Sequence, residues 1–442
     1  MSLTSALPAC KLYAYMGQQQ QNAGGGGGDN KSPCIVLDGP IIVGAGPSGL
    51  AVAATLRQHG VPFTVVERSG GVADLWTNRT YDRLRLHLPK VFCELPHVAF
   101  PPDFPTYPTK HDFLRYLHSY AARFAIAPLL RRTVTRAWYD HPASLWRVTT
   151  TTTSSSATSV ITEYASPWLV VASGENAEVV VPKVKGRERF AGEALHSSEY
   201  RSGERFRGMR VLVVGCGNSG MEMCLDLCEH GAMPFMSVRS GVSTNDYLVH
   251  VLPREMFGAS TFGIAMKLLR WLPIKMVDRF LLLVARMVLG DTEKYGLKRP
   301  KLGPLEIKNI TGKSPVLDVG AWSLIKSGNI KIVPEVESFS GNGARFVDGN
   351  EMAFDAVIFA TGYRSNVPSW LQEDGELFTE EGKLRSSGSS SEWRWRGPNG
   401  LYCVGFSGRG LLGAGADALR AAADIAGRWQ ETQQAAANIS SV

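Results

Sequence analysis

Short apolar runs alternate with amphipathic stretches along this chain, and two of these alternations share one pattern. The first spans residues 41–67 and reads as an apolar strand, a glycine-rich turn, an alanine-rich helical stretch and a second strand. The other spans residues 211–238 and repeats the same order with the same glycine spacing. Each pattern predicts a strand–helix–strand unit with parallel strands.

Three further segments complete the expected organisation. The polar run "TTTTTSSSATS" at 149–159 lies between two strand-like segments and predicts a long hairpin loop. The apolar run 356–360 predicts a buried strand. A last helix is expected over about 416–430, where it closes the fold.

Size and composition indicate a globular protein with two domains. The chain has 442 residues, of which 44% are hydrophobic and 20% are charged. Single cores usually stop growing near about 250–300 residues. The formal charge of +7 is dispersed along the sequence, so no nucleic-acid partner is expected. The seven cysteines form no CxxC pair and no histidine cluster has zinc spacing, so we expect neither a dithiol nor a metal site.

Two segments bear on location. Residues 1–39 contain "QQQQ" and "GGGGG" without the pattern of a secretory signal, which predicts a disordered leader and a cytoplasmic protein. The apolar run 280–290 is shorter than the ~20 residues of a membrane-spanning helix. It favours a buried or site-covering helix. Association with a membrane surface, such as that of the endoplasmic reticulum, is the less favoured alternative.

The first glycine-rich turn, "GAGPSG" at 44–49, has the spacing of a phosphate-binding loop. Gly44 allows a tight turn, Gly46 lets a pyrophosphate approach the backbone, and Gly49 lets the helix pack close to the strand. Glu67 ends the next strand, where a carboxylate can bind both hydroxyls of an adenosine ribose. A structural turn with a solvated Glu67 is the alternative. The whole arrangement favours a dinucleotide site at the positive end of the helix.

The second turn, "GCGNSG" at 215–220, is followed by a strand that ends differently. Arg239 stands where the first unit has an acid, and a guanidinium suits a ribose 2′-phosphate. We therefore expect NADPH rather than NADH, and an exposed strand-end charge is the alternative for Arg239. The residues expected to bind NADPH are Gly215, Cys216, Gly217, Asn218, Ser219, Gly220 and Arg239.

Between the two turns, "FAGEALHSSEY" at 190–200 fits the pattern FxGxxxHxxxY. This pattern resembles the identifying motif of the flavin-containing monooxygenases, and "FATGY" at 359–363 fits the same superfamily. The resemblance implies FAD in the first site and NADPH in the second. The residues that it indicates at the FAD are Gly44, Ala45, Gly46, Pro47, Ser48, Gly49, Glu67, Arg68, Leu75, Trp76, His87 and Asp417.

Together these features predict an α/β fold with two dinucleotide-binding, Rossmann-like domains, in which the NADPH domain is inserted into the FAD domain. The expected boundaries are a leader at 1–39, an FAD domain at 40–175 and 330–430, an NADPH domain at 180–325, and a tail at 431–442.

Longer segments, such as "RTYDRLRLHLPK", "HVLPREMFG" and "GRGLLGAGADA", are similar to the plant YUCCA flavin monooxygenases. That resemblance implies oxidative decarboxylation of indole-3-pyruvate to indole-3-acetate, the hormone auxin, by O2 and NADPH through a C4a-(hydro)peroxyflavin. Phenylpyruvate is a further candidate substrate. The alternatives are an oxygenase of nitrogen or sulfur compounds, an NADPH oxidase, and a protein that binds FAD and NADPH without turnover. The sequence leaves the oligomeric state open.

No side chain is assigned a catalytic role, because the flavin carries the chemistry and needs no protein nucleophile. His87 falls where general flavin monooxygenases have an asparagine near the flavin, so it is a candidate in the site, and an ordinary hydrogen-bonded histidine is the equal alternative. His196 and Tyr200 are expected to orient the second domain rather than to act in acid–base chemistry. Ser173 departs from the threonine usual in the family.

Overall fold

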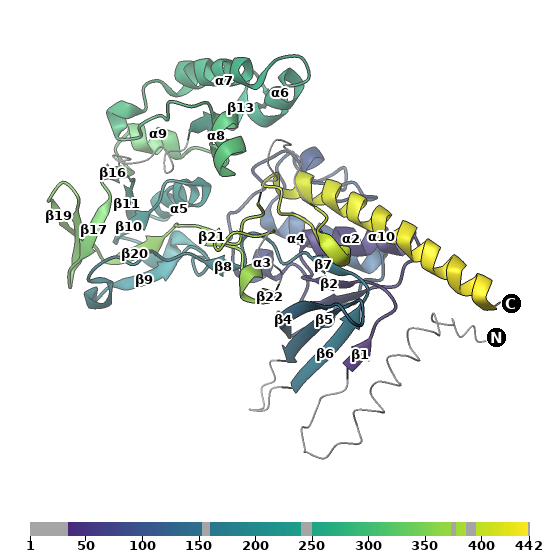
Figure 1. The fold of residues 1–442 in the computed structure, drawn as a ribbon. Helices are drawn as coiled ribbons and strands as arrows, with labels where there is room; N and C mark the ends of the chain where they lie inside the picture. Colours follow the sequence, from purple (N-terminus) through teal and green to yellow (C-terminus); the bar gives the residue numbers. More distant parts are fainter. Residues whose placement is uncertain (1–33, 153–159, 240–249, 373–376, 386–394, 441–442) are drawn as a thin grey trace.

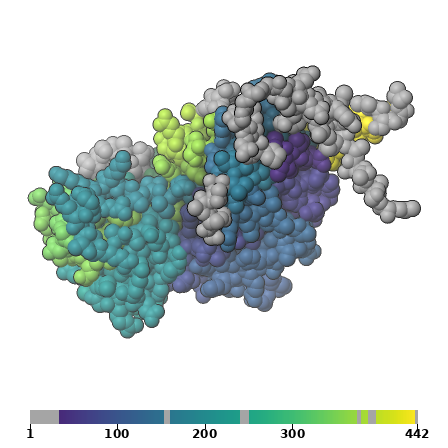
Figure 2. Space-filling model, turned by 90° about the horizontal axis from the view of Figure 1, so that it is seen from below, coloured from purple at the N-terminus to yellow at the C-terminus, as the bar shows by residue number. Residues whose placement is uncertain are grey.

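Two α/β units lie beside each other in the computed structural model (Figure 1). Figure 2 shows them as two masses, with the early part of the chain in purple and blue and the middle part in teal. The segments that the structure describes are 34–152, 160–239, 250–372, 377–385 and 395–440.

The first unit is built on a four-stranded parallel sheet of order β23-β7-β2-β3. Its central strands are wholly buried because every residue in them is apolar. The long helix α10 packs along α2, and both contribute to one apolar core with α4. The elements are β2 (Ile41–Val43), β3 (Thr64–Val66), β7 (Leu169–Val171), β23 (Leu401–Cys403), α2 (Pro47–Gln58), α3 (Asp74–Asn78), α4 (Lys110–Arg123) and α10 (Gly410–Ser440).

A second sheet in this unit has the order β1-β6-β5-β4-β22. The prediction of a disordered leader at 1–39 is wrong for its last residues. Residues 34–36 form strand β1, which pairs in parallel with β6. Residues 1–33 lie outside the described residues, as does the tip of the expected hairpin loop at 153–159. The strands are β1 (Cys34–Val36), β4 (Arg132–Asp140), β5 (Leu145–Thr152), β6 (Val160–Ser166) and β22 (Leu371–Gln372).

The second unit has a five-stranded parallel sheet of order β16-β11-β10-β20-β9, joined to a small antiparallel sheet. We expected the chain to return to the first unit at residue 330. That expectation disagrees with the strand pairing, because β16 and β20 complete the sheet around β10. The elements are β9 (Glu193–His196), β10 (Arg210–Val214), β11 (Met233–Ser237), β16 (Lys331–Val333), β17 (Val336–Phe339), β18 (Gly343–Phe346), β19 (Glu351–Ala353), β20 (Ala356–Phe359), α5 (Asn218–Glu229) and α9 (Ala321–Lys326).

A helical region lies at one end of the second unit (Figure 1). None of the helices within the described ranges combines the length and apolarity that crossing a bilayer requires. The elements of this region are α6 (Thr261–Leu268), α7 (Ile274–Leu289), α8 (Pro304–Thr311), β12 (Val251–Pro253), β13 (Glu255–Met256), β14 (Ala259–Ser260) and β15 (Val316–Asp318).

The chain crosses between the units twice, and the two crossings pair with each other. Strand β8 (Glu178–Val179) leaves the first unit and β21 (Tyr363–Arg364) returns to it, in antiparallel register. The tail expected at 431–442 is helical to residue 440, because α10 continues without a break. The single-turn 3-10 helices are Lys90–Phe92, Arg187–Arg189, Gly203–Phe206, Glu293–Tyr295, Val367–Ser369 and Pro398–Gly400.

Candidate nucleotide sites

The first glycine-rich turn joins β2 to α2, and its three glycines are needed for two different reasons. Gly44 has φ +110°, and a Cβ there would lie 2.6 Å from the carbonyl oxygen of Ala172. A Cβ at Gly49 would overlap the carbonyl oxygen of Gly44. By contrast, no atom lies within 4 Å of the Cβ position of Gly46. The space beside Gly46, at the positive end of α2, is therefore open to an anionic group.

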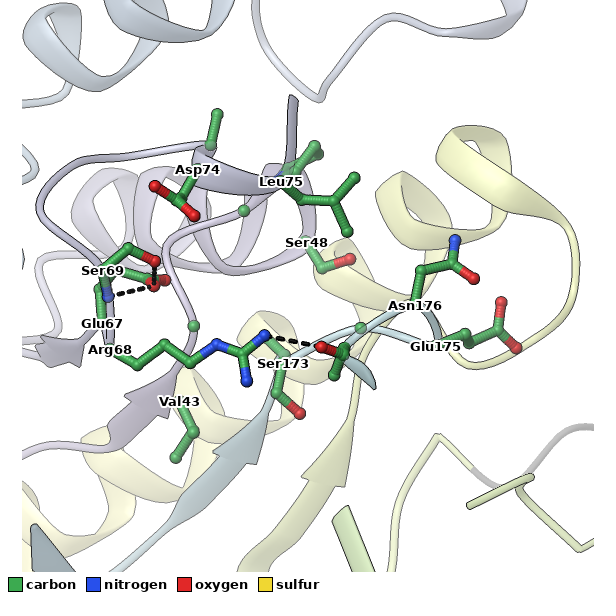
Figure 3. Close-up of a pocket in the computed structure, with 18 of the residues that line it drawn as sticks. Val43, Ser48, Glu67, Arg68, Ser69, Asp74, Leu75, Ser173, Glu175 and Asn176 are labelled. Carbon is green, nitrogen blue, oxygen red and sulfur yellow. Dashed lines mark hydrogen bonds between the residues drawn. The ribbon is translucent and has the colours of Figure 1, made fainter. Parts of the chain in front are cut away.

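A cavity of about 330 Å³ opens from this turn (Figure 3). Four of the residues indicated for FAD do not line it, namely Ala45, Gly49, His87 and Asp417. Gly49 packs against the turn, Ala45 is fully buried, and Asp417 lies behind the wall, where its carboxylate accepts from the backbone N–H of Gly405 at 3.4 Å. The indicated residues that line the cavity are Gly44, Gly46, Pro47, Ser48, Glu67, Arg68, Leu75 and Trp76.

Glu67 is held in place by three hydrogen bonds from the protein itself. Its Oε2 accepts from the backbone N–H of Ala45 at 2.8 Å, and its Oε1 accepts from the N–H and hydroxyl of Ser69 at 2.9 and 2.6 Å. Figure 3 shows Glu67 and Ser69 together at one side of the cavity. A carboxylate offers about four lone-pair positions, so Glu67 is oriented while keeping capacity for a ligand hydroxyl.

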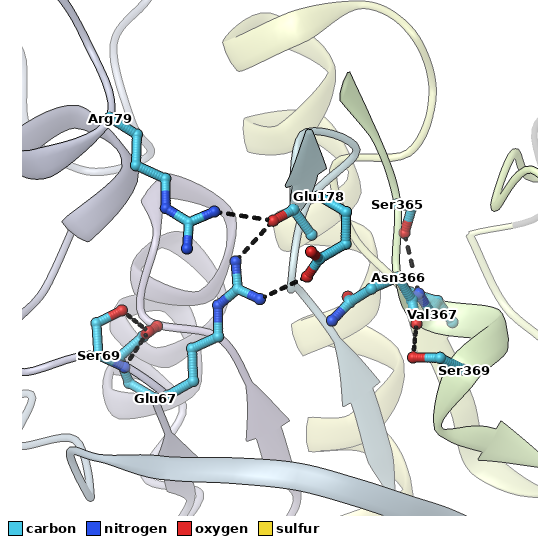
Figure 4. Close-up of polar contacts among 10 residues, drawn as sticks. Glu67, Ser69, Arg79, Glu178, Ser365, Asn366, Val367 and Ser369 are labelled. Atoms are coloured by element: carbon cyan, nitrogen blue, oxygen red, sulfur yellow. Dashed lines mark hydrogen bonds and ion pairs between the residues drawn. The ribbon is translucent and has the colours of Figure 1, made fainter. Parts of the chain in front are cut away.

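Two arginines fix the cavity wall to the point where the chain leaves the first unit. Arg68 pairs with Glu178 at 2.9 Å and donates to the carbonyl oxygen of Ala177 at 2.8 Å. Arg79 donates to the same carbonyl at 3.2 Å, so the two guanidinium groups converge on it (Figure 4). Arg68, indicated for FAD from the sequence, thus also anchors the first crossing segment.

Other polar groups of this cavity were missed by the sequence analysis. Ser173 Oγ and Asn366 Oδ1 line it and are buried, and neither has a hydrogen-bond partner within the described part of the chain. Buried polar atoms without partners are costly unless a ligand or water satisfies them. Glu175 lines the same wall. In the sequence, the Ser173–Gly174 turn that follows β7 could have indicated this wall of the cavity. The cavity therefore fits a polar ligand beyond its phosphate cradle.

The second glycine-rich turn joins β10 to α5 and repeats the first in detail. Gly215 has φ +117°, and a Cβ there would lie 2.5 Å from the carbonyl oxygen of Ala360. A Cβ at Gly220 would overlap the carbonyl oxygen of Gly215, whereas Gly217 has no atom within 4 Å of its Cβ position. The turn is also tied to β15, because Asn218 Oδ1 accepts from the N–H of Leu317 at 3.0 Å. The same cradle for phosphates is thus present twice.

Arg239 is the second residue after β11, whereas Glu67 is the first residue after β3 in the first unit. The Nε of Arg239 lies 3.7 Å from Glu335 Oε1, and both side chains are 42% exposed. The segment after it, 240–249, lies outside the described residues. Cys216, inside the turn, is a thiol whose pKa is raised by burial, so it is neutral near pH 7. The Arg239 guanidinium, close to the end of β11, is exposed enough to contact an incoming phosphate.

His87 does not line the cavity and instead joins the two units. Its Nε2 lies 2.7 Å from Glu222 Oε1 on α5, and Glu222 is 7% exposed. The hydroxyl of Tyr81, on the same segment, is buried. Burial and then the charge of Glu222 raise the pKa of Tyr81 well above its usual value. A short segment of the first unit therefore meets the helix that follows the second turn.

The motif residues His196 and Tyr200 are both buried and both bonded within the protein. The ring nitrogens of His196 lie 3.0 Å from Ser198 Oγ and 3.2 Å from the carbonyl oxygen of Gly362. Tyr200 donates to Asp226 Oδ2 at 2.6 Å. Burial lowers the pKa of His196. These contacts tie His196, at the end of β9, to the second crossing segment, and they tie Tyr200 to α5.

Comparison with known proteins shows what the whole chain is similar to. A family model described as "FMO-like: Flavin-binding monooxygenase-like" matches residues 40–374. Proteins named "Indole-3-pyruvate monooxygenase YUCCA8" from Oryza sativa subsp. indica and subsp. japonica are 98% identical over 426 residues, which is 96% of this chain and 100% of each relative.

Solved structures share the fold at low sequence identity. A flavin-containing monooxygenase from Stenotrophomonas maltophilia has a TM-score of 0.62 and 21% identity, and the match covers 88% of this chain and 98% of that one. A structure described as "OTEMO complex with FAD and NADP" has a TM-score of 0.64 and 17% identity, with 92% and 86% covered. These chains are also built from two units of the Rossmann type, as expected from the two glycine-rich turns.

Proposed function

This chain belongs to the flavin-binding monooxygenase-like family, and from that premise we propose that it converts indole-3-pyruvate to indole-3-acetate. One molecule each of indole-3-pyruvate, O2 and NADPH, with a proton, gives indole-3-acetate, CO2, NADP+ and water. The observation that carries the proposal is the 98% identity to proteins named for this activity, over the full length of those proteins. Phenylpyruvate, which shares the aromatic ring and the 2-oxo acid, is proposed as a second substrate.

FAD is proposed for the first site, where it would supply the activation of oxygen. The open position at Gly46 would receive the pyrophosphate, and Glu67 would bind the ribose hydroxyls. Ser173 and Asn366 offer partnerless polar atoms to the same ligand. The fit rests on the cradle, the oriented carboxylate and these two groups, and it extends the set of FAD residues proposed from the sequence.

NADPH is proposed for the second site. The open position at Gly217 would receive its pyrophosphate, and Arg239 would bind the 2′-phosphate, which a carboxylate at that place would repel. The Glu335 carboxylate lies 3.7 Å from the Nε of Arg239 and competes with the 2′-phosphate for it. This division assigns FAD to the first unit and NADPH to the second, with the second unit inserted between the crossings at β8 and β21.

His87 and Glu222 are proposed as positioning residues between the two sites. Their pair joins the segment after α3 in the first unit to α5 in the second. Because α5 begins at the second cradle, this pair would set the place of the nicotinamide nucleotide relative to the first unit. The proposal gives His87 a role through Glu222 rather than direct contact with the reacting atoms.

The test supplies purified protein with indole-3-pyruvate, NADPH and ¹⁸O2. We expect CO2 and indole-3-acetate with one labelled oxygen in the new carboxylate, since oxidative decarboxylation by oxygen must transfer one of its atoms. Phenylpyruvate should give labelled phenylacetate. Decarboxylation without label, or oxidation of a tertiary amine or thioether with both acids untouched, would contradict the proposal. Label only in hydrogen peroxide, with NADPH consumed, would indicate an oxidase. Yellow protein that consumes no NADPH would indicate binding without turnover.

A further inference from the structure

Helix α7 and the turn before it carry large apolar side chains on their outer surface. Met276, Leu283 and Met287 are 51, 57 and 65% exposed, and Trp271, between α6 and α7, is 86% exposed. Figure 1 shows α6 and α7 at the end of the second unit that lies opposite β9. Apolar side chains scattered singly on a surface need no explanation, but a row of them on one element does.

Met276, Leu283 and Met287, three of the five exposed large apolar residues of α7, form one stripe, because they are spaced by seven and four residues along the helix. The opposite face of α7 is also apolar and packs inward through Val277 and Leu281, which are buried. Helix α7 therefore has one apolar face that completes the core and a second that faces outward. Core packing explains only the first.

The exposed charges within residues 261–290 are all positive. Residues 261–290 contain five basic residues and one acid, and each of the five basic residues is exposed. The acid, Asp278, is turned inward, where its carboxylate accepts from the N–H groups of Leu305 and Glu306 at 2.9 and 3.1 Å and caps α8. The outward-facing basic residues are Lys267, Arg270, Lys275, Arg279 and Arg286.

We propose that this surface, made of Trp271, the α7 stripe and the five basic residues, binds a membrane that carries anionic lipids. A helix that lies in the membrane interface combines an apolar face with Trp, Leu or Phe and flanking Lys or Arg side chains. In α7, Arg279 and Arg286 follow Met276 and Leu283 by three residues each, so the cations border the apolar stripe. The helix would lie along the membrane and would not cross it.

The charge distribution decides between this occupant and a second copy of the chain. A symmetric dimer through the same surface would bring two sets of five cations together, and like charges across an interface are unfavourable. Anionic headgroups neutralise the same cations, each of which contributes attraction close to such a surface. The proposal concerns where the enzyme works and does not depend on its substrate.

The experiment measures flotation of the whole, FAD-loaded chain with vesicles. One set is pure phosphatidylcholine and the other is phosphatidylcholine mixed with phosphatidylserine. Two double variants test the surface, Leu283→Ser with Met287→Ser and Arg279→Gln with Arg286→Gln. The matched control is Val347→Ser, which replaces a 52% exposed apolar residue in the loop between β18 and β19. Rates of NADPH oxidation equal to that of the unchanged chain would show that each variant is folded.

We expect the unchanged chain and the Val347→Ser control to float with the mixed vesicles and to bind pure phosphatidylcholine far more weakly. Loss of two apolar side chains should weaken binding by roughly tenfold or more, and loss of two cations should also weaken it by about tenfold or more. Added salt should weaken binding of the unchanged chain. The proposal is overturned if the unchanged chain floats with neither vesicle, or if both double variants float as it does. Self-association that Leu283→Ser with Met287→Ser abolishes, without vesicle binding, would assign the surface to a second copy.

Discussion

The two glycine-rich turns have almost the same backbone, yet the charged group beside each turn is held in a different way. Gly46 and Gly217 precede their helices with φ/ψ of −79°/−176° and −70°/−178°, and each helix has 12 residues. Glu67 is 9% exposed and accepts three hydrogen bonds from the protein. The Arg239 side chain is 42% exposed, and its Nε lies 3.7 Å from Glu335 Oε1. A binding side chain that the protein holds in place suits a cofactor that stays bound. An exposed side chain suits a nucleotide that must leave in every cycle.

The two helices also differ in what they bury. Counting from the first glycine of each turn, Ala51 and Thr55 of α2 correspond to Glu222 and Asp226 of α5. Helix α2 packs along α10 in an apolar core, whereas the two acids of α5 meet polar groups from other segments, including His87. The two positions thus lie against apolar packing in α2, whereas in α5 they carry acids, one of which contacts the first unit through His87. Hydrogen bonds and ion pairs are directional, so we expect the orientation of α5 to depend on its contact with the first unit.

The largest expected effect comes from filling the open position of each cradle. Gly46→Ala adds a methyl group where the protein has no atom within 4 Å, and its φ of −79° suits alanine, so the chain should fold. The methyl group would obstruct the pyrophosphate at a cost of about 1–3 kcal/mol, or roughly 5- to 150-fold in FAD affinity. Absorbance of the purified protein should show little or no flavin. Gly217→Ala should stay yellow and raise the KM for NADPH.

The control for these variants is Gly44→Ala, whose Cβ would press on Ala172 and whose φ of +110° disfavours a side chain. This variant should lower the melting temperature of the protein without FAD, which Gly46→Ala should not. Stoichiometric FAD in purified Gly46→Ala would contradict the assignment of the first cradle.

The next-largest expected effect tests whether the His87–Glu222 pair stabilises the contact between the two units. His87→Ala leaves the Glu222 carboxylate, 7% exposed, without its partner, and loss of a hydrogen bond to a charged group costs about 1.5–3 kcal/mol. We expect a lower melting temperature and a raised KM for NADPH at unchanged FAD content. His87→Gln, which keeps a donor, should recover part of both.

The matched control is Glu229→Gln, which weakens a second pair between the units, Arg83 with Glu229 at 2.6 Å. The Glu229 side chain is 55% exposed, so this change should cost less than about 1 kcal/mol. Equal effects of His87→Ala and Glu229→Gln on stability and KM would mean that burial of Glu222 confers no special role on its pair.

Sequence reasoning recovered the part of each site that is local. Glycine spacing and apolar periodicity predicted both turns, both helices and the two strand-end residues Glu67 and Arg239, because each follows from a few consecutive residues. The two Rossmann-type units were predicted for the same reason, and the family comparisons confirm them.

What the sequence did not predict depends on contacts between distant residues. Strand β1 exists because β6, more than 120 positions away, offers a free edge, and β20 joins the second sheet although it follows that sheet's other strands. The partner of His87 is 135 positions away on α5. Asp417 lies behind the cavity because α10 turns it toward Gly405. No local pattern encodes such pairings, since they are decided by which surfaces meet after the units form.

Reversing the charge at the second strand end should have a moderate effect. Arg239→Glu removes a cation and adds an anion beside the proposed 2′-phosphate, and a charge-assisted hydrogen bond contributes about 1.5–3 kcal/mol. Because the side chain is 42% exposed, we expect the lower end, roughly a tenfold loss for NADPH. The KM for NADH should change little. Arg345→Glu, a charge reversal at an exposed arginine on β18, should alter neither, and an unchanged preference between NADPH and NADH in Arg239→Glu would refute the assignment.

The smallest expected effect concerns the carboxylate beside Arg239. Glu335→Gln removes the anion that lies 3.7 Å from the guanidinium, so a bound 2′-phosphate no longer competes with it or feels its repulsion. Both side chains are 42% exposed, and exposed ion pairs contribute about 0–1 kcal/mol, so the KM for NADPH should fall by no more than roughly fivefold. The gain should shrink as salt is added, because salt screens exposed charges. FAD content should not change, because the first anchor is held by its own hydrogen bonds. Glu337→Gln, on the neighbouring strand β17, is the matched control. A higher KM for NADPH in Glu335→Gln would show that the carboxylate orients Arg239 for the phosphate, and the second anchor would then be preorganised like the first.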